Sequence, residues 1–186
     1  MKFESTSIPD VFIIEPKRIG DARGVFMETY KSRDFKAATG VDPEFVQDNF
    51  SMSEAKDTIR GLHFQTPPFA QGKLVRCLRG SILDVAVDVR IGSPTFLKSV
   101  TVELSQKNAK QLWIPSGFLH GFRTLEPDTE VAYKCTQYYS PEHDGSVLWN
   151  DTDLAVNWGE ITGSVLLSDK DQNARRFSDF DNPFQY

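Results

Sequence analysis

Short strand-like runs recur along this chain at spacings of about ten residues, and turns rich in Gly and Pro separate them. The clearest examples are Lys73–Arg79, Ile82–Arg90 and Leu97–Leu104, whereas helix-like periodicity is scarce. A parallel α/β fold would need helices between its strands. The pattern therefore favours an all-β antiparallel fold, a sandwich or a barrel, in one domain that spans residues 1–186.

Turn residues mark the expected boundaries of individual strands. Val11–Glu15 is interpreted as an edge strand because Pro16 closes it. Gly80 and Ser81 are expected to form a tight hairpin turn between the strands on either side. Further strands are expected over Val25–Thr29, Phe45–Met52, Gln111–Ile114, Phe118–Phe122 and Thr129–Tyr139.

Two helices are expected. Ser32–Ala38 is the clearer one, with Ser32 as its N-cap and Gly40 as its stop. A second, short helix is expected to begin within Ser168–Asp171.

Composition and charge argue against several classes of function. The chain has 39% apolar and 25% charged residues and a net charge of -5, which is typical of a soluble globular protein and unlike a nucleic-acid-binding surface. No apolar run approaches the roughly 20 residues that a membrane-spanning helix needs. Met1–Ser5 has no apolar core and no cleavage site, so we expect no signal peptide and a cytoplasmic location. Cys77 and Cys135 are expected to be buried free thiols.

One strand-like run, Ile59–Gln65, mixes apolar residues with a cation and a histidine. Successive side chains of a strand point to opposite faces. A regular strand would place Arg60, Leu62 and Phe64 on one face, and His63 and Gln65 on the other. A bulge at Gly61 would change that division. The run is a candidate wall of a pocket, with a base on one side and a guanidinium near its start.

The segment Pro115–His120 has the spacing Pro-x-Gly-x-x-His, which resembles a conserved motif of cupins, the small double-sheet jelly rolls. In metal-binding cupins this histidine is one ligand, and a His-x-His pair on an earlier strand supplies others. Here the earlier strand offers His63, but Gln65 stands two positions along, and His143 lies in a loop. Because such metals need several converging ligands, we expect no metal site. His120 taken alone could be a packed sheet histidine.

Several single residues have both a functional and a structural interpretation. Arg23, Arg60 and Lys73 lie beside glycines or at strand ends, where they could bind phosphate oxygens or be solvated surface charges. Arg60 fits the surface alternative least, because its strand is otherwise apolar. Tyr133 could be a packing residue or a proton donor, and Asp171 by default is a carboxylate at a helix start.

Eight short blocks, in order between about Asp10 and Asp171, together resemble the dTDP-4-dehydrorhamnose 3,5-epimerase family. Each block is weak alone, but eight in sequence make a strong signal. The blocks are Asp21-x-Arg-Gly-x-Phe-x-Glu28, Gln47-Asp-Asn49, Arg60-Gly-Leu-His-Phe-Gln65, Gln71-Gly-Lys-Leu-Val-Arg76, Asp84-Val-Ala-Val-Asp88, Ile114-Pro-x-Gly-Phe-x-His-Gly-Phe122, Tyr133-Lys-x-Thr-x-Tyr-Tyr139 and Leu167-Ser-x-Lys-Asp171.

The resemblance implies a metal-free, cofactor-independent cupin-like jelly roll, an isomerase that acts as a homodimer on a dTDP-4-keto-6-deoxyhexose in dTDP-L-rhamnose biosynthesis. It implies that His63 is the base and that Asp171 orients it. Tyr133 would be the acid that reprotonates the sugar, and Lys73 would steady the oxygen at carbon 4.

The same resemblance implies the substrate contacts. His120 would lie in the sugar pocket, and Arg60 and Arg23 would bind the pyrophosphate. The residues around the nucleotide would be Phe26, Glu28, Gln47 and Asn49. Arg23 and Glu28 would reach in from the partner subunit. Further ligand-contact positions are matched by Tyr139, Lys170 and Asp144, the last of which stands where a glutamate is expected.

The implied reaction needs these residue types. A ketone at carbon 4 acidifies the protons on carbons 3 and 5, and inversion removes a proton from one face and returns one to the other. Imidazole, with an ordinary pKa of about 6.5, suits the removal, and a carboxylate on its other nitrogen fixes the tautomer. A cation at the enolate oxygen stabilises charge that exists only after the proton has left. A phenol can return the proton on the opposite face.

Four other functions stay open. The nearest is a sister enzyme that epimerises only carbon 3 or only carbon 5 for another deoxysugar pathway, since small changes near Tyr133 and Tyr139 could decide between them. A sugar-nucleotide ketoisomerase fits the block around Asp171 poorly. The intact set of His63, Lys73, Tyr133 and Asp171 weighs against a non-catalytic binding module, and a metal-dependent cupin oxygenase is the least favoured.

Overall fold

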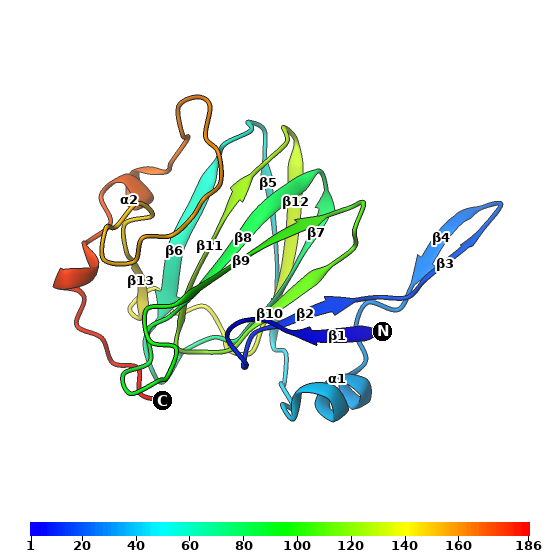
Figure 1. Cartoon of the computed structure of the whole chain (residues 1–186), viewed down its shortest axis with the longest axis horizontal. Helices are drawn as coiled ribbons and strands as arrows, with labels where there is room; N and C mark the ends of the chain where they lie inside the picture. The colour runs from blue at the N-terminus through cyan, green and yellow to red at the C-terminus, as the bar shows by residue number, and fades with distance from the viewer.

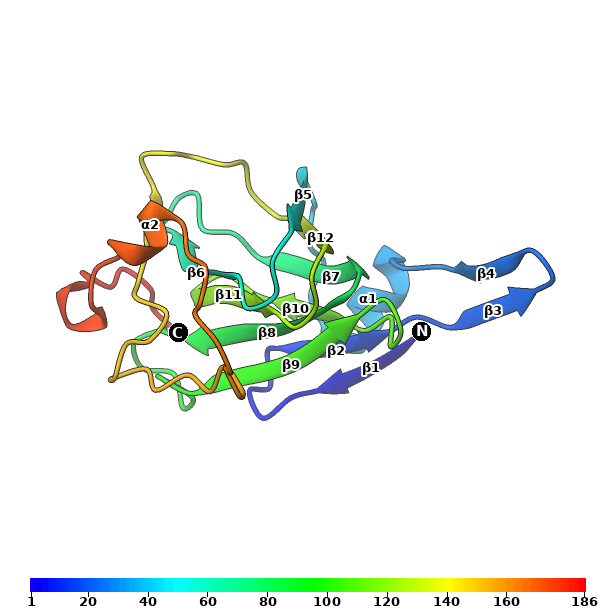
Figure 2. The same ribbon diagram turned by 90° about the horizontal axis from the view of Figure 1, so that it is seen from above.

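The computed structural model describes residues 1–186 and has two antiparallel sheets that pack face to face (Figure 1, Figure 2). The first sheet has six strands, in the spatial order β1 (Lys2–Ser5), β2 (Phe12–Glu15), β10 (Gln111–Ile114), β7 (Lys73–Arg79), β12 (Thr129–Cys135) and β5 (Gln47–Ser53). The second has five, in the order β13 (Asp144–Ser146), β6 (Ile59–Gln65), β11 (Phe118–Thr124), β8 (Ser81–Asp88) and β9 (Ser99–Ser105). The all-β fold with antiparallel sheets is confirmed.

The remaining elements lie outside the two sheets. A two-stranded hairpin, β3 (Arg18–Asp21) and β4 (Gly24–Met27), projects from the body of the molecule (Figure 1). The helices are α1 (Ser32–Thr39), α2 (Asp169–Gln172) and the 3₁₀ turn η1 (Phe177–Asp179). None of these helices has the length and apolar character that crossing a membrane requires.

Both faces of the second sheet are buried, by different parts of the chain. Its inner face packs against the first sheet, where Ile82, Ala86 and Phe122 belong to one apolar cluster with residues of β7 and β12. Its outer face is covered by the chain that follows β13, through a second cluster that includes Leu62, Phe64, Val85, Val87, Leu154, Trp158, Phe180 and Phe184. Each such large side chain contributes roughly 1.5–3 kcal/mol when fully buried. The C-terminal segment is therefore part of the packed structure.

Two expected details of the strands are wrong. Gly80 does not close a hairpin, because β7 belongs to the first sheet and β8 to the second. Its positive φ of 73° lets the chain turn from one sheet to the other. Val11–Glu15 is not an edge strand either, since β2 pairs with β1 on one side and with β10 on the other. Pro16 lies just beyond the paired residues, so its missing N–H does not disturb the pairing.

Helix α1 begins where expected but is capped differently. Lys31, not Ser32, occupies the N-cap position, and no side chain caps the helix there. Asp34 in the first turn lies 3.5 Å from the Lys31 ammonium and favours the helix N-terminus. Gly40 ends the helix with a φ of 75°, as expected.

Candidate active site

Strand β6 contains a bulge that brings two functional side chains to one face. His63 pairs with His120 of β11, but Arg60 pairs with Phe122, so three residue steps on β6 oppose two on β11. The bulge considered at Gly61 is therefore present, and Arg60 does not share a face with Leu62. Arg60 and His63 instead line the same pocket, which a regular strand would not allow for residues three apart.

Gly61 and Gly121 explain how the two strands tolerate this bulge. A Cβ atom at Gly61 would lie 2.6 Å from the Cα of Gly121, and one at Gly121 would lie 2.8 Å from the Arg60 carbonyl oxygen. Gly61 also has a φ of 138°. Only glycine at both positions allows the backbones to approach this closely. Gly61 on β6 and Gly121 on β11 thus determine the direction in which His63 points.

An interior pocket of about 420 Å³ opens between the sheets beside this bulge. Its chemistry comes from five elements: Arg60 and His63 from β6, Lys73 from β7, His120 from β11, Tyr133 from β12, and Asp171 from α2. We refer to this cavity as the interior pocket. Residues separated by more than a hundred positions in the chain therefore meet in one cavity, as the sequence predicts for the sugar site.

His63 and Asp171 form a directly bonded pair. The Nε2 atom of His63 lies 2.6 Å from the Oδ1 atom of Asp171. The His63 side chain is 31% exposed, whereas that of Asp171 is 3% exposed. Ser168 caps α2 by accepting the Asp171 backbone N–H at 3.2 Å. Burial raises the pKa of Asp171, but its bonds to His63, to the Ser168 hydroxyl and to the Gly61 amide outweigh burial and hold the pKa below its ordinary value. Asp171 is thus an anion that orients an accessible imidazole.

Lys73 and Tyr133 stand beside each other on the first sheet. The Lys73 ammonium lies 5.9 Å from the centre of the Tyr133 ring. Burial lowers the pKa of Lys73, against the opposing charges of Cys135, Asp144 and Asp84. Burial also raises the pKa of Tyr133, so the phenol keeps its proton at neutral pH.

His120, which lies opposite His63 on the neighbouring strand β11, belongs to a second histidine–aspartate pair. Its Nε2 atom lies 2.8 Å from Asp84 Oδ1, and the side chains of His120 and Asp84 are 8% and 0% exposed. Burial lowers the pKa of His120, although Asp84 acts in the opposite direction. His120 is therefore a neutral imidazole at pH 7 that lies against the interior pocket.

Comparison with known proteins decides what this arrangement belongs to. A family model described as dTDP-4-dehydrorhamnose 3,5-epimerase matches residues 5–179. The chain belongs to this family. A dTDP-4-dehydrorhamnose 3,5-epimerase of Sinorhizobium fredii is 50% identical over 186 residues, which cover 100% of this chain and 94% of that protein.

Solved structures of family members have the same fold. The dTDP-6-deoxy-D-glucose-3,5-epimerase of Legionella pneumophila, in complex with dTDP-4-keto-L-rhamnose, is 44% identical and superposes with a TM-score of 0.94 over 100% of this chain and 98% of that chain. A 3'-monoepimerase of Streptomyces bikiniensis in complex with dTDP-quinovose is 34% identical, with a TM-score of 0.86 over 94% of this chain and 87% of that chain. The cupin-like jelly roll expected from the sequence is confirmed.

The residues that the epimerase family resemblance assigns to the nucleotide divide into two groups. Gln47 and Asn49 lie on one face of β5, as predicted, and the Gln47 amide donates a 3.0 Å hydrogen bond to Asn49. The backbone N–H of Tyr139 donates to Gln47 at 2.9 Å, and the Tyr139 hydroxyl lies 3.3 Å from Asp144. Asp144 in turn binds Lys170, the neighbour of Asp171. These contacts form a continuous polar chain from β5 to α2.

The second group lies away from the interior pocket of its own chain. Arg23, Phe26 and Glu28 belong to the projecting hairpin and the turn after it. Arg23 forms an ion pair with Asp21 at 2.6 Å, and Glu28 with Lys31 at 2.7 Å. Phe26 is 69% exposed. The structure of one chain does not bring these epimerase-family positions to the catalytic groups.

The sequence-based interpretation gave no role to Asp84, Ser168 or the Gly61–Gly121 contact. Asp84 could have been noticed, because it is a charged residue on an apolar strand in phase with Ala86. The capping role of Ser168 is visible in its spacing from Asp171, but the close approach of two glycines leaves no signal in a single sequence. No group of three or more His, Cys, Asp or Glu side chains converges in a way that could hold a metal ion.

Proposed function

We propose that this chain is a dTDP-4-dehydrorhamnose 3,5-epimerase that converts dTDP-4-dehydro-6-deoxy-D-glucose to dTDP-4-dehydro-L-rhamnose, with His63 as its base. The observation that carries the proposal is the convergence of an imidazole–carboxylate pair, a half-buried lysine and a half-buried tyrosine in one cavity. The family match along nearly the whole chain supports the substrate class.

Proton removal is assigned to the His63–Asp171 pair. In the neutral form, His63 donates Nε2–H to Asp171, which leaves Nδ1 free to accept a proton from carbon 3 or carbon 5. When His63 takes that proton, the carboxylate 2.6 Å away stabilises the imidazolium. Because Asp171 is held as an anion before the reaction, little reorganisation is needed.

Lys73 is assigned to the enolate and Tyr133 to the return of the proton. Removal of the proton moves charge onto the oxygen at carbon 4, where an ammonium in a partly buried site stabilises it far better than water would. The phenol of Tyr133 stands on the first sheet, opposite His63 on the second. A donor across the cavity from the base inverts the carbon when it protonates the enolate.

Arg60, Gln47, Asn49 and His120 are assigned to the dTDP and sugar parts of the substrate. The Arg60 guanidinium donates to Ser53 and to the Met52 carbonyl oxygen, each at 3.1 Å, which holds it at the rim between β5 and β6. This placement suits bidentate contact with a pyrophosphate. Tyr139, Asp144 and Lys170 close the side of the site nearest α2.

Proton NMR of dTDP-4-keto-6-deoxyglucose with the protein in heavy water tests the proposal. Deuterium should appear at carbons 3 and 5, and addition of the downstream reductase should then give dTDP-L-rhamnose. Deuterium at one carbon alone would show the mono-epimerase activity that the Streptomyces neighbour represents. Retained dTDP binding without exchange at either carbon would leave the fold assignment intact and reject the catalytic one.

We also propose that two copies of the chain share each active site as a homodimer. Arg23, Phe26 and Glu28 carry expected nucleotide contacts, yet they lie on or just after a hairpin that projects from the body of the molecule (Figure 2), and none of them lines the interior pocket. Ile19 and Val25 on the same hairpin are 55% and 54% exposed. Insertion of this hairpin into a second copy would bury Ile19 and Val25, and it would bring Arg23 to the pyrophosphate of the substrate bound by that copy.

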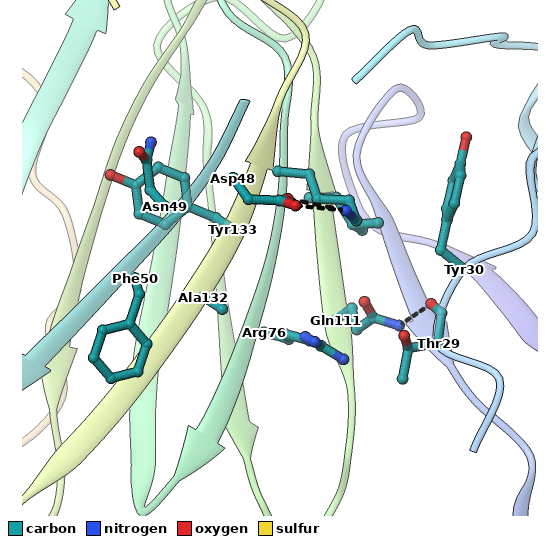
Figure 3. A pocket seen from close by; sticks show the side chains of 11 residues that line it. Thr29, Tyr30, Asp48, Asn49, Phe50, Arg76, Gln111, Ala132 and Tyr133 are labelled. Carbon is teal, nitrogen blue, oxygen red and sulfur yellow. Dashed lines mark hydrogen bonds and ion pairs between the residues drawn. The ribbon is translucent and has the colours of Figure 1, made fainter. Parts of the chain in front are cut away.

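The outer face of the first sheet offers a surface for such a copy. An outer groove of about 270 Å³ runs across it, with Tyr30 and Thr29 on one side and Phe50 on the other (Figure 3). Phe50 and Met52 are 62% and 45% exposed on β5, which is the end strand of its sheet. An open strand edge with exposed apolar residues is the kind of surface that pairs with another chain.

Subunit complementation tests the shared site. His63→Ala and Arg23→Ala chains should each be inactive alone. After they are unfolded together and refolded in equal amounts, random pairing should restore about a quarter of wild-type activity, because half of the dimers then hold one fully intact site. If both residues act within one chain, no mixed dimer contains an intact site and activity stays absent. Light scattering gives the oligomeric state in parallel.

A cytoplasmic location is part of the same proposal. Cys77 and Cys135 are both free and buried. Unpaired thiols are the ordinary condition of a reducing compartment.

A further inference from the structure

Asp171 is carried by an element that cannot hold its own position. Helix α2 has four residues, from Asp169 to Gln172, and lies outside both sheets. A helix this short has too few internal hydrogen bonds to be stable alone. The 2.6 Å contact between Asp171 and His63 therefore depends on how the chain on either side of α2 is anchored.

The upstream anchor is a short bridge to the start of β6. The Ile59 N–H donates to the Leu166 carbonyl oxygen at 3.0 Å, and the Leu166 N–H donates to the Asp57 carbonyl oxygen at 3.1 Å. This bridge lies five residues before Asp171 and sets the path of the chain into α2, which Lys170 also holds through its ion pair with Asp144. A second anchor beyond α2 is needed to fix its orientation.

The downstream anchor attaches to the chain that directly follows β13, the strand beside β6. The Leu148 N–H donates to the Arg175 carbonyl oxygen at 2.9 Å. Two residues later, the Phe177 N–H donates to the Asp151 carboxylate at 2.8 Å. Asp151 is 7% exposed, and its other oxygen accepts the Asp153 N–H at 2.9 Å. A buried carboxylate thus fastens the first turn of η1.

An aromatic cluster then holds the segment against the back of β6. The ring of Phe180 lies 4.6 Å from that of Phe64, and the rings of Phe184 and Phe64 are 6.1 Å apart. Phe180 is 8% exposed. Phe64 directly follows His63 on β6 and points to the opposite face. The segment therefore packs against the outer face of β6, and His63 lies on the opposite face of the same strand. Figure 1 shows its course beside β6 and β13.

We propose that residues 173–184, which we call the C-terminal clasp, position Asp171 against His63, and that the main positioning residues are Phe180 within the clasp and Asp151, which binds its first turn. The proposal rests on the assigned roles of His63 and Asp171. Neither Phe180 nor Asp151 touches the interior pocket. Each acts through α2, by fixing the distance and the angle at which the carboxylate meets the imidazole.

The expected consequence is a loss in the rate of proton removal with little change in substrate binding. A displacement of about 1 Å at a catalytic group can cost about a hundredfold in rate. Gln47 and Asn49 stand on β5 and Arg60 at the start of β6, whereas the clasp packs on Phe64 near the end of β6, so dTDP contacts should survive. Phe180→Ala and Asp151→Asn should therefore lower kcat and deuterium exchange about ten- to a hundredfold and leave KM within about twofold.

A double-mutant cycle with Asp171→Asn tests the inference. Where Asp171 can no longer act as an anion, misplacing it removes nothing more, so Phe180→Ala should change kcat by less than about twofold in that background. Loss of folded protein alone would lower kcat by the same factor in both backgrounds. Tyr186→Ala is the matched control, because Tyr186 lies two residues beyond the clasp and packs on Arg90, not on Phe64; its kcat should equal that of the wild type.

Equal losses in the two backgrounds, or a loss confined to KM, would overturn the inference. Phe180→Leu keeps most of the apolar volume, and it should retain an intermediate kcat if Phe180→Ala does not fold. Failure of the proposed function looks different, because the wild type itself would then show no exchange; a wild-type kcat in Asp171→Asn would reject the role assigned to Asp171. A large loss in Asp171→Asn with none in Phe180→Ala or Asp151→Asn would reject the clasp alone.

Discussion

The two histidine–aspartate pairs of this molecule have nearly the same bond and different surroundings. His63 and His120 face each other across β6 and β11, and each places Nε2 within 2.8 Å of a carboxylate oxygen. The aspartate of the His120 pair is in the sheet, on β8, whereas Asp171 arrives from a four-residue helix near the end of the chain. Both members of the His120–Asp84 pair lie on strands of one sheet, whereas the His63–Asp171 pair joins a strand to a separate short helix.

Exposure separates what the two pairs can do. The His63 side chain is 31% exposed and that of His120 is 8% exposed. Burial holds the pKa of His120 down, and the second oxygen of Asp84 has no partner. A base must receive a proton and then carry a charge, which a deeply buried imidazole does poorly. A hydrogen bond to a carboxylate is therefore not enough to make a histidine a base. Access to the substrate and solvation decide which histidine can take up and release a proton.

The largest expected effect comes from removing one histidine at a time. His63→Ala should lower kcat about a thousandfold or more, because it deletes the base, while dTDP still binds. His120→Ala should lower kcat far less. Turnover of both variants and titration with dTDP check this, and unchanged turnover in His63→Ala would refute the base assignment.

Tyr133→Phe sharpens the comparison by separating removal of the proton from its return. The variant should still exchange substrate protons with solvent, because His63 is intact, but should invert carbon about a hundredfold more slowly without the donor. Proton NMR in heavy water reports exchange and inversion together. If the variant inverts at the normal rate, another group returns the proton, and His120 becomes the first candidate.

Exchange of each carboxylate for an amide should give a smaller contrast. Asp171→Asn should lower kcat about a hundredfold, since an amide cannot stabilise the imidazolium. Asp84→Asn should change kcat less than about tenfold, because a neutral His120 can donate to an amide oxygen as well as to a carboxylate. Equal losses in the two variants would mean that both pairs take up protons during turnover.

The smallest effect is a dependence of stability on pH. His120 has a folded-state pKa below its ordinary 6.5, chiefly because of burial. As the pH falls through about 6.5, the unfolded chain binds a proton that the folded chain does not, so stability decreases until the folded pKa is passed. The melting temperature of the wild type should therefore drop more between pH 7.5 and 5.5 than that of His120→Gln. Parallel curves would show that His120 does not titrate differently in the two states.

The sequence predicts the sheets well because strand spacing and alternation are local properties. Gln47 and Asn49 share a face as expected, and Gly40 ends α1. The sheet to which a strand belongs is a non-local property. The prediction of a hairpin at Gly80 was wrong for that reason, because β7 and β8 belong to different sheets. The pairing of Val11–Glu15 with β10 could not be predicted either, since β10 lies far from it in the sequence.

The site divides along the same line. Single-chain pattern alone marked His63 and Arg60 as a pocket wall, but the bulge that puts both on one side needs Gly121, sixty residues away in the chain. The pairing of His63 with Asp171 came from the family resemblance and not from spacing. The locations of Arg23, Phe26 and Glu28 cannot follow from one chain if their proposed partner is a second copy.

The position of α2 near the C-terminus has a consequence for the order of folding. Few strands pair with their neighbours in sequence: β6 pairs with β11, and β5 pairs with β12. Such non-local pairing makes folding slow, and chains that emerge from the ribosome fold from the N-terminal side first. Asp171 and the aromatic residues behind it are synthesised after every strand of the two sheets, so a nascent chain can complete both sheets while its imidazole still lacks its carboxylate. The His63–Asp171 pair then forms only after the sheets, together with the packing that covers the back of β6.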